Sequence, residues 1–216
     1  FAGFYKTIRQ PINKKNSYEV VLARINKLEI KSCTPILMEL FIAHEQNQLS
    51  DTELTDAFHT LESYMARRII CGLGTQYYNK LFVGLGAEIE KLLEKDGAAY
   101  LDAFKSALLN KSGKSRFPND HDFMDKFMTF ELYNAKASVR KYLLERFENF
   151  GNREMIAVEE QISDGSLTIE HIMPQTLTEE WKVGLGEQWE LIYSKYIDTI
   201  GNLTLTAYNS DYSNLS

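Results

Sequence analysis

The sequence predicts a mainly α-helical fold, with a bundle-like helical domain followed by a small unit of two strands and a helix. Three observations support this prediction. Apolar residues recur at helical spacing through the first 150 residues, the composition changes after Gly151, and two short β-branched stretches follow. We therefore expect a helical domain at 1–150, a polar connector at 151–165 and a ββα unit at 166–216.

The helical pattern is clearest between residues 50 and 70. Ser50 and Glu53 have the spacing of a capping box, which satisfies backbone N–H groups at the start of a helix. The apolar residues that follow recur at steps of three and four, on one helical face: Leu54, Phe58, Leu61, Met65 and Ile69. Similar stretches before and after this one predict a helical bundle.

Two short stretches near the end of the chain have the composition of strands. The first is LTIEHIM, which Pro174 terminates, and the second is NLTLT. A proline favours an extended backbone in the residue before it, which fits a strand end. Residues from Tyr208 to Ser213 are rich in helix-starting types, so a helix is expected after the second strand.

Composition limits the class of protein. Apolar residues make up 44% and charged residues 25% of the 216 residues, as in ordinary soluble domains. Cys33 and Cys71 form no CxxC pair, so reduced thiols and a cytoplasmic location are expected. No apolar run is long enough for a membrane. The net charge of −6 argues against nucleic-acid binding over the whole surface, but allows a local patch with a metal ion.

Four polar residues lie where the predicted elements begin or end. His171 ends the first strand with Glu170 beside it, Asn202 opens the second strand, and Asn209 starts the element that follows. Hydrolysis of a phosphodiester needs a base that takes a proton from water and a cation near the phosphate. A neutral imidazole suits the first task, and carboxylate and amide oxygens are ligands that suit Mg²⁺. Alternate strand residues point to opposite faces, so Glu170 and His171 meet only if the strand ends or bulges there.

The segments IEHIMPQ and IGNLTLTAYNSDYSN resemble the His-Asn-His (HNH) nuclease motif. They are similar in particular to the C-terminal domain of the GmrSD-type modification-dependent restriction endonucleases. In that family, E-H-I-x-P-Q, G-N-L-T-L and N-S-x-x-S-N segments follow one another in this order. The helical stretch LESYMARRIICGLGTQYYNKLF resembles the same family, so the resemblance runs from about residue 50 to the end. It implies a ββα-metal (HNH) nuclease unit that hydrolyses DNA.

The resemblance also implies a role for each of the four residues. His171 is the general base, and Asn202 orients the base or the loop around it. Glu170 and Asn209 are the metal ligands, with Mg²⁺ as the expected ion and Mn²⁺ as the alternative. Substrate-binding residues are not assigned. The motif's last position holds Asn209 and not histidine, which implies weaker metal binding, and we expect the last helix to be cut short at Ser216.

The implied setting is defence in the cytoplasm against foreign, modified phage DNA. Members of the family also carry an N-terminal domain that resembles nucleotide-hydrolysing, ParB-like folds. Nothing in this sequence matches such a domain. We therefore expect it in the same protein or on a partner subunit, and we expect no membrane partner.

Other functions stay open at this point. One alternative is a catalytically inactive helical module that binds DNA or protein. Another is an RNA-directed HNH nuclease with the same site. In a purely structural reading, His171 is a buried histidine at a strand end.

Basic residues of the helical part are further candidates for contact with phosphate. Lys111, Lys114 and Arg116 lie in a Gly/Ser loop. Arg67 and Arg68 are adjacent on a helix and point in different directions, so we expect one to meet phosphate and the other to pair with an acid.

Overall fold

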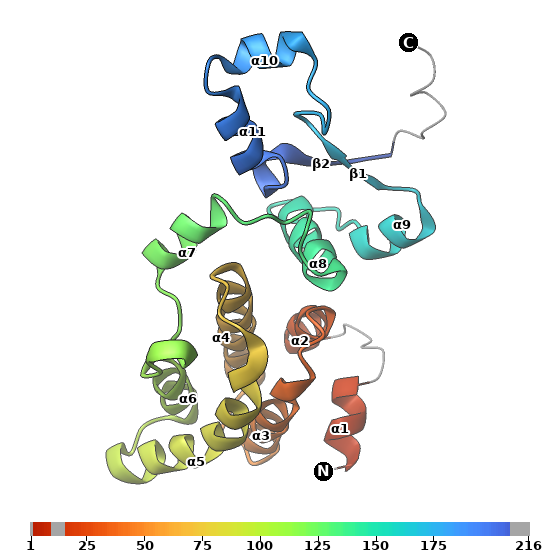
Figure 1. The fold of residues 1–216 in the computed structure, drawn as a ribbon. Helices are drawn as coiled ribbons and strands as arrows, with labels where there is room; N and C mark the ends of the chain where they lie inside the picture. Colours follow the sequence, from red (N-terminus) through yellow and green to blue (C-terminus); the bar gives the residue numbers. More distant parts are fainter. Residues whose placement is uncertain (1, 10–15, 208–216) are drawn as a thin grey trace. The chain divides into compact units, whose positions relative to one another are not determined.

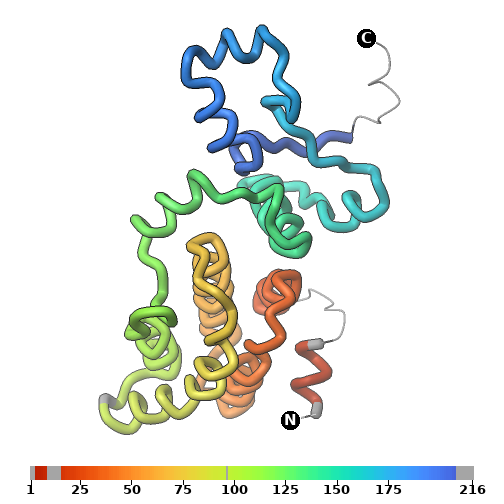
Figure 2. The backbone as a smooth tube through the Cα atoms, viewed as in Figure 1, coloured from red at the N-terminus to blue at the C-terminus, as the bar shows by residue number. Residues whose placement is uncertain are grey.

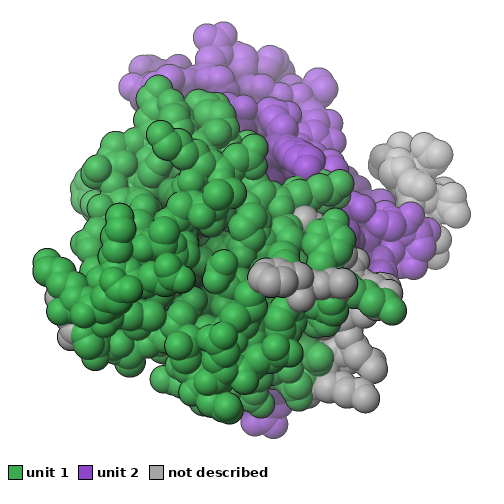
Figure 3. Space-filling view, turned by 90° about the horizontal axis from the view of Figure 1, so that it is seen from below, with its two compact units in different colours: residues 1–123 green, residues 124–216 purple. Residues whose placement is uncertain are grey.

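The computed structural model describes residues 2–9 and 16–207, and most of these residues are helical (Figure 1). The predicted mainly helical fold class is thereby confirmed. The chain forms two compact units, Phe1–Phe123 and Met124–Ser216, which Figure 3 shows in different colours. No helix of the described part of the chain combines the length and the apolar character that a membrane crossing requires.

The first unit is a bundle of helices. They are α1 (Ala2–Arg9), α2 (Ser17–Lys27), α3 (Thr34–Glu45), α4 (Asp51–Ile70), α5 (Tyr78–Asp96) and α6 (Tyr100–Leu109). Short 3-10 helices lie at Lys31–Cys33, Thr75–Tyr77 and Gly113–Ser115, and α7 (Asp120–Phe127) begins at the end of the unit. Helix α4 packs against α2, α3 and α6 and so forms the centre of the bundle (Figure 1).

Helix α4 begins and packs as its sequence predicts. The Ser50 hydroxyl accepts a hydrogen bond from the Glu53 N–H, and the Glu53 carboxylate accepts one from the Ser50 N–H. The backbone bond from Ser50 stabilises the charged carboxylate and lowers the pKa of Glu53. The predicted apolar face is the buried one as far as Met65, with Leu54, Phe58 and Leu61 completely covered. At the end of the helix Ile70 is buried, and Ile69 is only partly so.

Arg68 is the most unusual buried residue of the first unit. Its side chain has no exposure, and its guanidinium lies 5.2 Å and 5.1 Å from the rings of Tyr64 and Tyr78. It donates hydrogen bonds to the carbonyl oxygens of Lys114, Arg116 and Gly74 at 2.8–3.2 Å. No carboxylate within the described residues pairs with it. Arg68 therefore holds two loops in place through backbone carbonyl groups, and its burial excludes contact with phosphate.

The neighbouring basic residues are paired within the same unit. Arg67 forms an ion pair of 2.6 Å with Asp120, so it is the arginine that meets an acid. Lys111 pairs with Glu88 at 2.5 Å. Arg116 lies 3.4 Å from a carboxylate oxygen of Asp122, and Lys114 lies over the ring of Tyr77. These contacts weaken the case for a phosphate-binding loop, because acids already neutralise most of its charge.

The second unit contains the only strands among the described residues, β1 (Thr168–His171) and β2 (Leu203–Thr206). They are antiparallel, with His171 opposite Leu203. Helices α8 (Ala137–Glu148) and α9 (Val158–Asp164) precede them, and α10 (Glu179–Leu185), α11 (Trp189–Tyr196) and a 3-10 helix at Ile200–Asn202 lie between them. Figure 2 shows the chain leaving β1, passing through α10 and α11 and returning to β2.

Helix α9 lies in the segment that the composition predicts to be a polar connector. It packs against α8, with Val158 completely buried, and ends at Gly165, whose φ of 82° requires the left-handed region. The segment predicted to be a connector therefore contains a helix. With so few apolar residues, this short helix has no recognisable periodicity.

The helix expected after β2 falls on residues 208–216, which lie outside the described residues. The complete ββα unit therefore stays a prediction. The same holds for the expected division at 1–150, 151–165 and 166–216.

Exchanging Arg68 for Met should lower the free energy of unfolding by about 2–4 kcal/mol, because buried carbonyl groups lose their donor. The matched exchange of Arg67, whose partner Asp120 is exposed, should cost less than about 1.5 kcal/mol. Urea unfolding followed by circular dichroism measures both values. Equal effects of the two substitutions would contradict the structural role assigned to Arg68.

Candidate active site

His171 ends β1 and lies on the inner face of the strand pair. Exposure alternates along β1, and the side chain of His171 is only 7% exposed. Its neighbour across the sheet is Leu203, and Ile169 and Leu205 share the same face. The strand pair thus holds one side of the imidazole among apolar residues.

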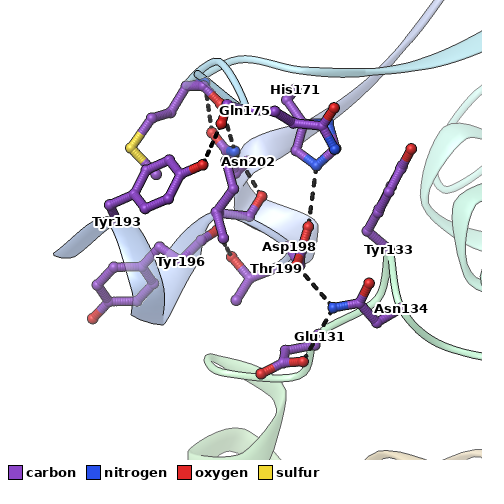
Figure 4. Close-up of polar contacts among 12 residues, drawn as sticks. Glu131, Tyr133, Asn134, His171, Gln175, Tyr193, Tyr196, Asp198, Thr199 and Asn202 are labelled. Atoms are coloured by element: carbon purple, nitrogen blue, oxygen red, sulfur yellow. Dashed lines mark hydrogen bonds and ion pairs between the residues drawn. The ribbon is translucent and has the colours of Figure 1, made fainter. Parts of the chain in front are cut away.

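Two side chains from distant segments fix the imidazole ring (Figure 4). Nε2 of His171 lies 3.3 Å from Oδ1 of Asp198, which follows α11. The ring of Tyr133 lies edge-on to the imidazole, with 4.4 Å between the ring centroids. The Asp198 side chain is 21% exposed, so this small polar cluster reaches the surface.

Asp198 is itself held by the segment that precedes α8. Its Oδ2 accepts a hydrogen bond of 2.8 Å from Nδ2 of Asn134, and its backbone carbonyl accepts one of 3.0 Å from the Tyr133 N–H. Nδ2 of Asn134 also donates to Glu131 at 3.3 Å. The second unit therefore brings together three segments that are far apart in the sequence.

Asn202 is buried and joins the end of β1 to the end of α11. Its carboxamide oxygen accepts a hydrogen bond of 2.7 Å from the Met173 N–H. Its nitrogen donates to the carbonyl oxygens of Met173 and Ile197 at 3.1 Å and 2.8 Å. All three of these side-chain hydrogen bonds go to backbone groups of the loop after the histidine and of the end of α11, so Asn202 holds these two segments together.

Glu170 lies on the outer face of β1, opposite Thr204. Its side chain is exposed and makes no hydrogen bond or ion pair within the described part of the chain. The strand pairing runs without a bulge from Thr168 to His171. The structure therefore places Glu170 and His171 on opposite faces of the strand, as the alternation along a strand requires.

Of the two predicted metal ligands, only Glu170 is among the described residues. Asn209 lies outside the described residues. Among residues 2–9 and 16–207, no three histidine, cysteine or acidic side chains gather closely enough to hold an ion. The metal site therefore stays a prediction.

An apolar cavity of about 460 Å³ adjoins the end of β1. Ile172 and Met173, which follow the histidine, form one wall, and Trp181 and Leu185 of α10 form another. Its polar lining residues include Asn202 and Thr199, whose side-chain hydrogen bonds go to neighbouring backbone groups. The cavity thus presents mainly apolar surface next to the site. The side chains of Asn202 and Thr199 already bond to backbone carbonyl groups.

One known family matches the part of the chain that contains this site. Residues 117–216 match the family of GmrSD restriction endonucleases, C-terminal domain. The match confirms the resemblance seen in the two motif segments. It also spans every residue that meets around His171, from Glu131 to Asn202. No curated protein and no solved structure matches the chain.

Asp198, Tyr133 and Asn134 of this candidate site were not predicted from the sequence. Asp198 stands only four residues before Asn202, and a carboxylate so near a motif residue is the one signal that would have indicated it. Tyr133 and Asn134 fall in the segment assigned to the helical domain. Nothing in the local pattern indicates that they approach His171.

Exchanging Asn202 for Asp should lower the free energy of unfolding of the second unit by about 2–4 kcal/mol. The carboxylate keeps one acceptor but no longer donates to the Met173 and Ile197 carbonyl groups. Trp181 and Trp189, the only tryptophans, both belong to this unit, so tryptophan fluorescence during urea unfolding measures the effect.

The matched control is the same exchange at Asn152, whose side chain is exposed in the same unit and donates one solvent-exposed hydrogen bond, to the carbonyl of Glu148. It should change the free energy of unfolding by no more than about 0.5 kcal/mol. A comparable loss at both positions would show that the carboxamide of Asn202 has no special structural role.

Proposed function

We propose that the second unit is the catalytic part of a metal-dependent HNH endonuclease that cuts foreign, modified phage DNA in the cytoplasm. The GmrSD family match indicates a restriction endonuclease role with DNA as the substrate. The observation that carries the proposal lies within this match. The histidine of the predicted motif stands at a strand end, and Asp198 and Tyr133 hold its ring there.

In the proposed reaction, a water oxygen attacks the phosphorus while His171 takes the proton of that water. A new P–O bond to the water oxygen forms as the bond to the leaving sugar oxygen breaks. The Asp198 carboxylate stabilises the imidazolium that results, because the two groups lie 3.3 Å apart. Asn202 keeps the loop after the histidine in place.

We propose Glu170 and Asn209 as ligands of Mg²⁺, with Mn²⁺ as a substitute. The exposed carboxylate of Glu170, which has no partner within the described residues, is a hard oxygen ligand of the kind that Mg²⁺ prefers. When bound, such an ion neutralises charge on the phosphate. The position of Glu170 next to the strand end leaves its carboxylate accessible to an ion and a phosphate.

The recognition of DNA modification belongs, in this proposal, to a ParB-like nucleotide-hydrolysing domain in the same protein or on a partner subunit. The net charge of −6 supports this division of tasks, since the chain lacks the overall positive charge that provides non-specific affinity for DNA. In this division, the described part of the chain cleaves the DNA, and the other domain recognises the modified target.

One observation favours a second candidate, a catalytically inactive binding module. Glu170 and His171 lie on opposite faces of β1, and the side chain of His171 is 7% exposed. A histidine that only stabilises the strand end would have the same surroundings. Cleavage by a variant that keeps those surroundings but lacks a base separates the two candidates.

Exchanging His171 for Gln should lower the rate of plasmid nicking by about 10²–10⁴-fold. The Gln carboxamide nitrogen still donates to Asp198, but it takes no proton from water. Supercoiled plasmid, modified and unmodified, is incubated with the parent protein and Mg²⁺ or Mn²⁺, and nicking is followed on agarose gels.

Circular dichroism shows whether the variant is folded, and an RNA of the same sequence tests the choice of nucleic acid. Undiminished nicking by the Gln variant would exclude His171 as the base. Absence of nicking on every modified and unmodified substrate would favour the binding module.

Exchanging Glu170 for Gln should raise the Mg²⁺ concentration required for half-maximal nicking by about tenfold or more. Glu180, an exposed carboxylate on α10, provides the matched control and should leave the metal requirement unchanged. Neither substitution should alter the free energy of unfolding, because both side chains are exposed. An unchanged metal titration for the Glu170 variant would remove this residue from the metal site.

A further inference from the structure

The hydrogen bonds around His171 determine which nitrogen of its ring carries the proton. An ionised carboxylate only accepts hydrogen bonds, so Oδ1 of Asp198, 3.3 Å from Nε2, requires a proton on that nitrogen. The neutral ring then has a lone pair on Nδ1. In this tautomer, Nδ1 is the ring nitrogen that has a lone pair able to accept a proton.

The orientation of the Asp198 carboxylate is fixed by Asn134, which Glu131 orients in turn. Nδ2 of Asn134 donates to Oδ2 of Asp198 at 2.8 Å and to Oε2 of Glu131 at 3.3 Å (Figure 4). Turning this amide over would direct its oxygen at two carboxylates, which is unfavourable. Glu131 therefore orients Asn134, Asn134 occupies Oδ2 of Asp198, and Oδ1 remains for His171.

We propose that Asp198 is the positioning residue of the proposed base: it keeps the proton of His171 on Nε2 and makes Nδ1 the reactive nitrogen. Tyr133 supports this arrangement, because its ring packs edge-on against the imidazole and its backbone N–H holds the Asp198 carbonyl. The assignment of the proton rests on hydrogen bonds alone. Its catalytic consequence rests on the proposed function.

The same network predicts a specific effect of Asp198→Asn. Asn134 still donates toward its partner, so the new side chain must turn its single carbonyl oxygen to Asn134 and its NH₂ group to His171. Nε2 then becomes the acceptor, and the proton moves to Nδ1. The isosteric substitution thus exchanges the tautomer without removing the side chain.

Long-range ¹H–¹⁵N spectra of the chain with ¹⁵N-labelled histidine distinguish the two tautomers. The chain has four histidines, and the signals of His171 are those absent from the His171→Gln variant. In mildly alkaline buffer we expect the proton on Nε2 in the wild type and on Nδ1 in Asp198→Asn. The Asn variant should nick plasmid at least tenfold more slowly, through kcat and not through KM.

Two further variants separate this role from a general structural one. Asp164→Asn makes the same exchange at an exposed turn of the second unit, where the oxygen that accepts from Ser166 is retained, and should alter neither spectrum nor rate. In the double variant Asp198→Asn, Asn134→Ala, the amide at position 198 is released. Its oxygen turns to His171, and the proton should return to Nε2.

A proton on Nδ1 in the wild type, or an unchanged tautomer in Asp198→Asn, would overturn the inference even if the protein cuts DNA. The expected exchange of tautomers in a protein that cuts no DNA would support the assignment of the proton, while the proposed function would fail. The spectra and the nicking assay thus report on the two claims separately.

Discussion

The second unit depends on the buried carboxamide of Asn202. A buried amide without partners would cost about 1–3 kcal/mol for each unsatisfied group, so its surroundings must supply both donors and acceptors. They come from Met173, just after β1, and from Ile197, just after α11. His171 stands two residues from the first of these anchors, and Asp198 stands one residue from the second. One side chain therefore fixes the spacing of the histidine and its carboxylate.

This constraint explains the long connection between the two strands. Antiparallel strands are commonly joined by two to five residues, yet here α10 and α11 separate β1 from β2. A longer loop raises the entropic cost of closure only slowly. The connection ends with Asp198 beside His171, and the backbone carbonyl of Asp198 binds Tyr133. The segment between β1 and β2 thus provides Asp198, the carboxylate beside the imidazole, in addition to joining the strands.

The sequence was informative wherever local pattern decides structure. The capping box and the apolar stripe of α4 predicted that helix, and β-branched stretches predicted both strands. The motif segments indicated His171 and Asn202 as site residues. They did not indicate that the Asn202 side chain bonds to the backbone groups of Met173 and Ile197. Long-range contacts were not predictable in this way. Nothing near Asn134 indicates a bond to Asp198, which is 64 positions away.

The two adjacent arginines of α4 show the same limit. Arg67 and Arg68 have identical chemistry, and helical geometry requires only that they point in different directions. Which one is buried depends on the loops at Gly74 and Lys114, which approach α4 in three dimensions. A sequence pattern assigns faces, whereas the partner on each face is a property of the folded unit.

The end of β1 is the place where the two faces of a strand can serve one reaction. Within a regular strand, adjacent residues such as Glu170 and His171 stay on opposite sides. After His171, the Ile172 N–H still donates to the backbone carbonyl of Asn202, as the next pair of the ladder would. The Met173 N–H instead donates to the carboxamide oxygen of the Asn202 side chain, so the backbone pairing ends there. A phosphate that approaches this end meets the edge of both faces. The proposed pairing of an outer ligand with an inner base therefore requires the strand pairing to end just beyond the histidine, and the Asn202 side chain provides that end at Met173.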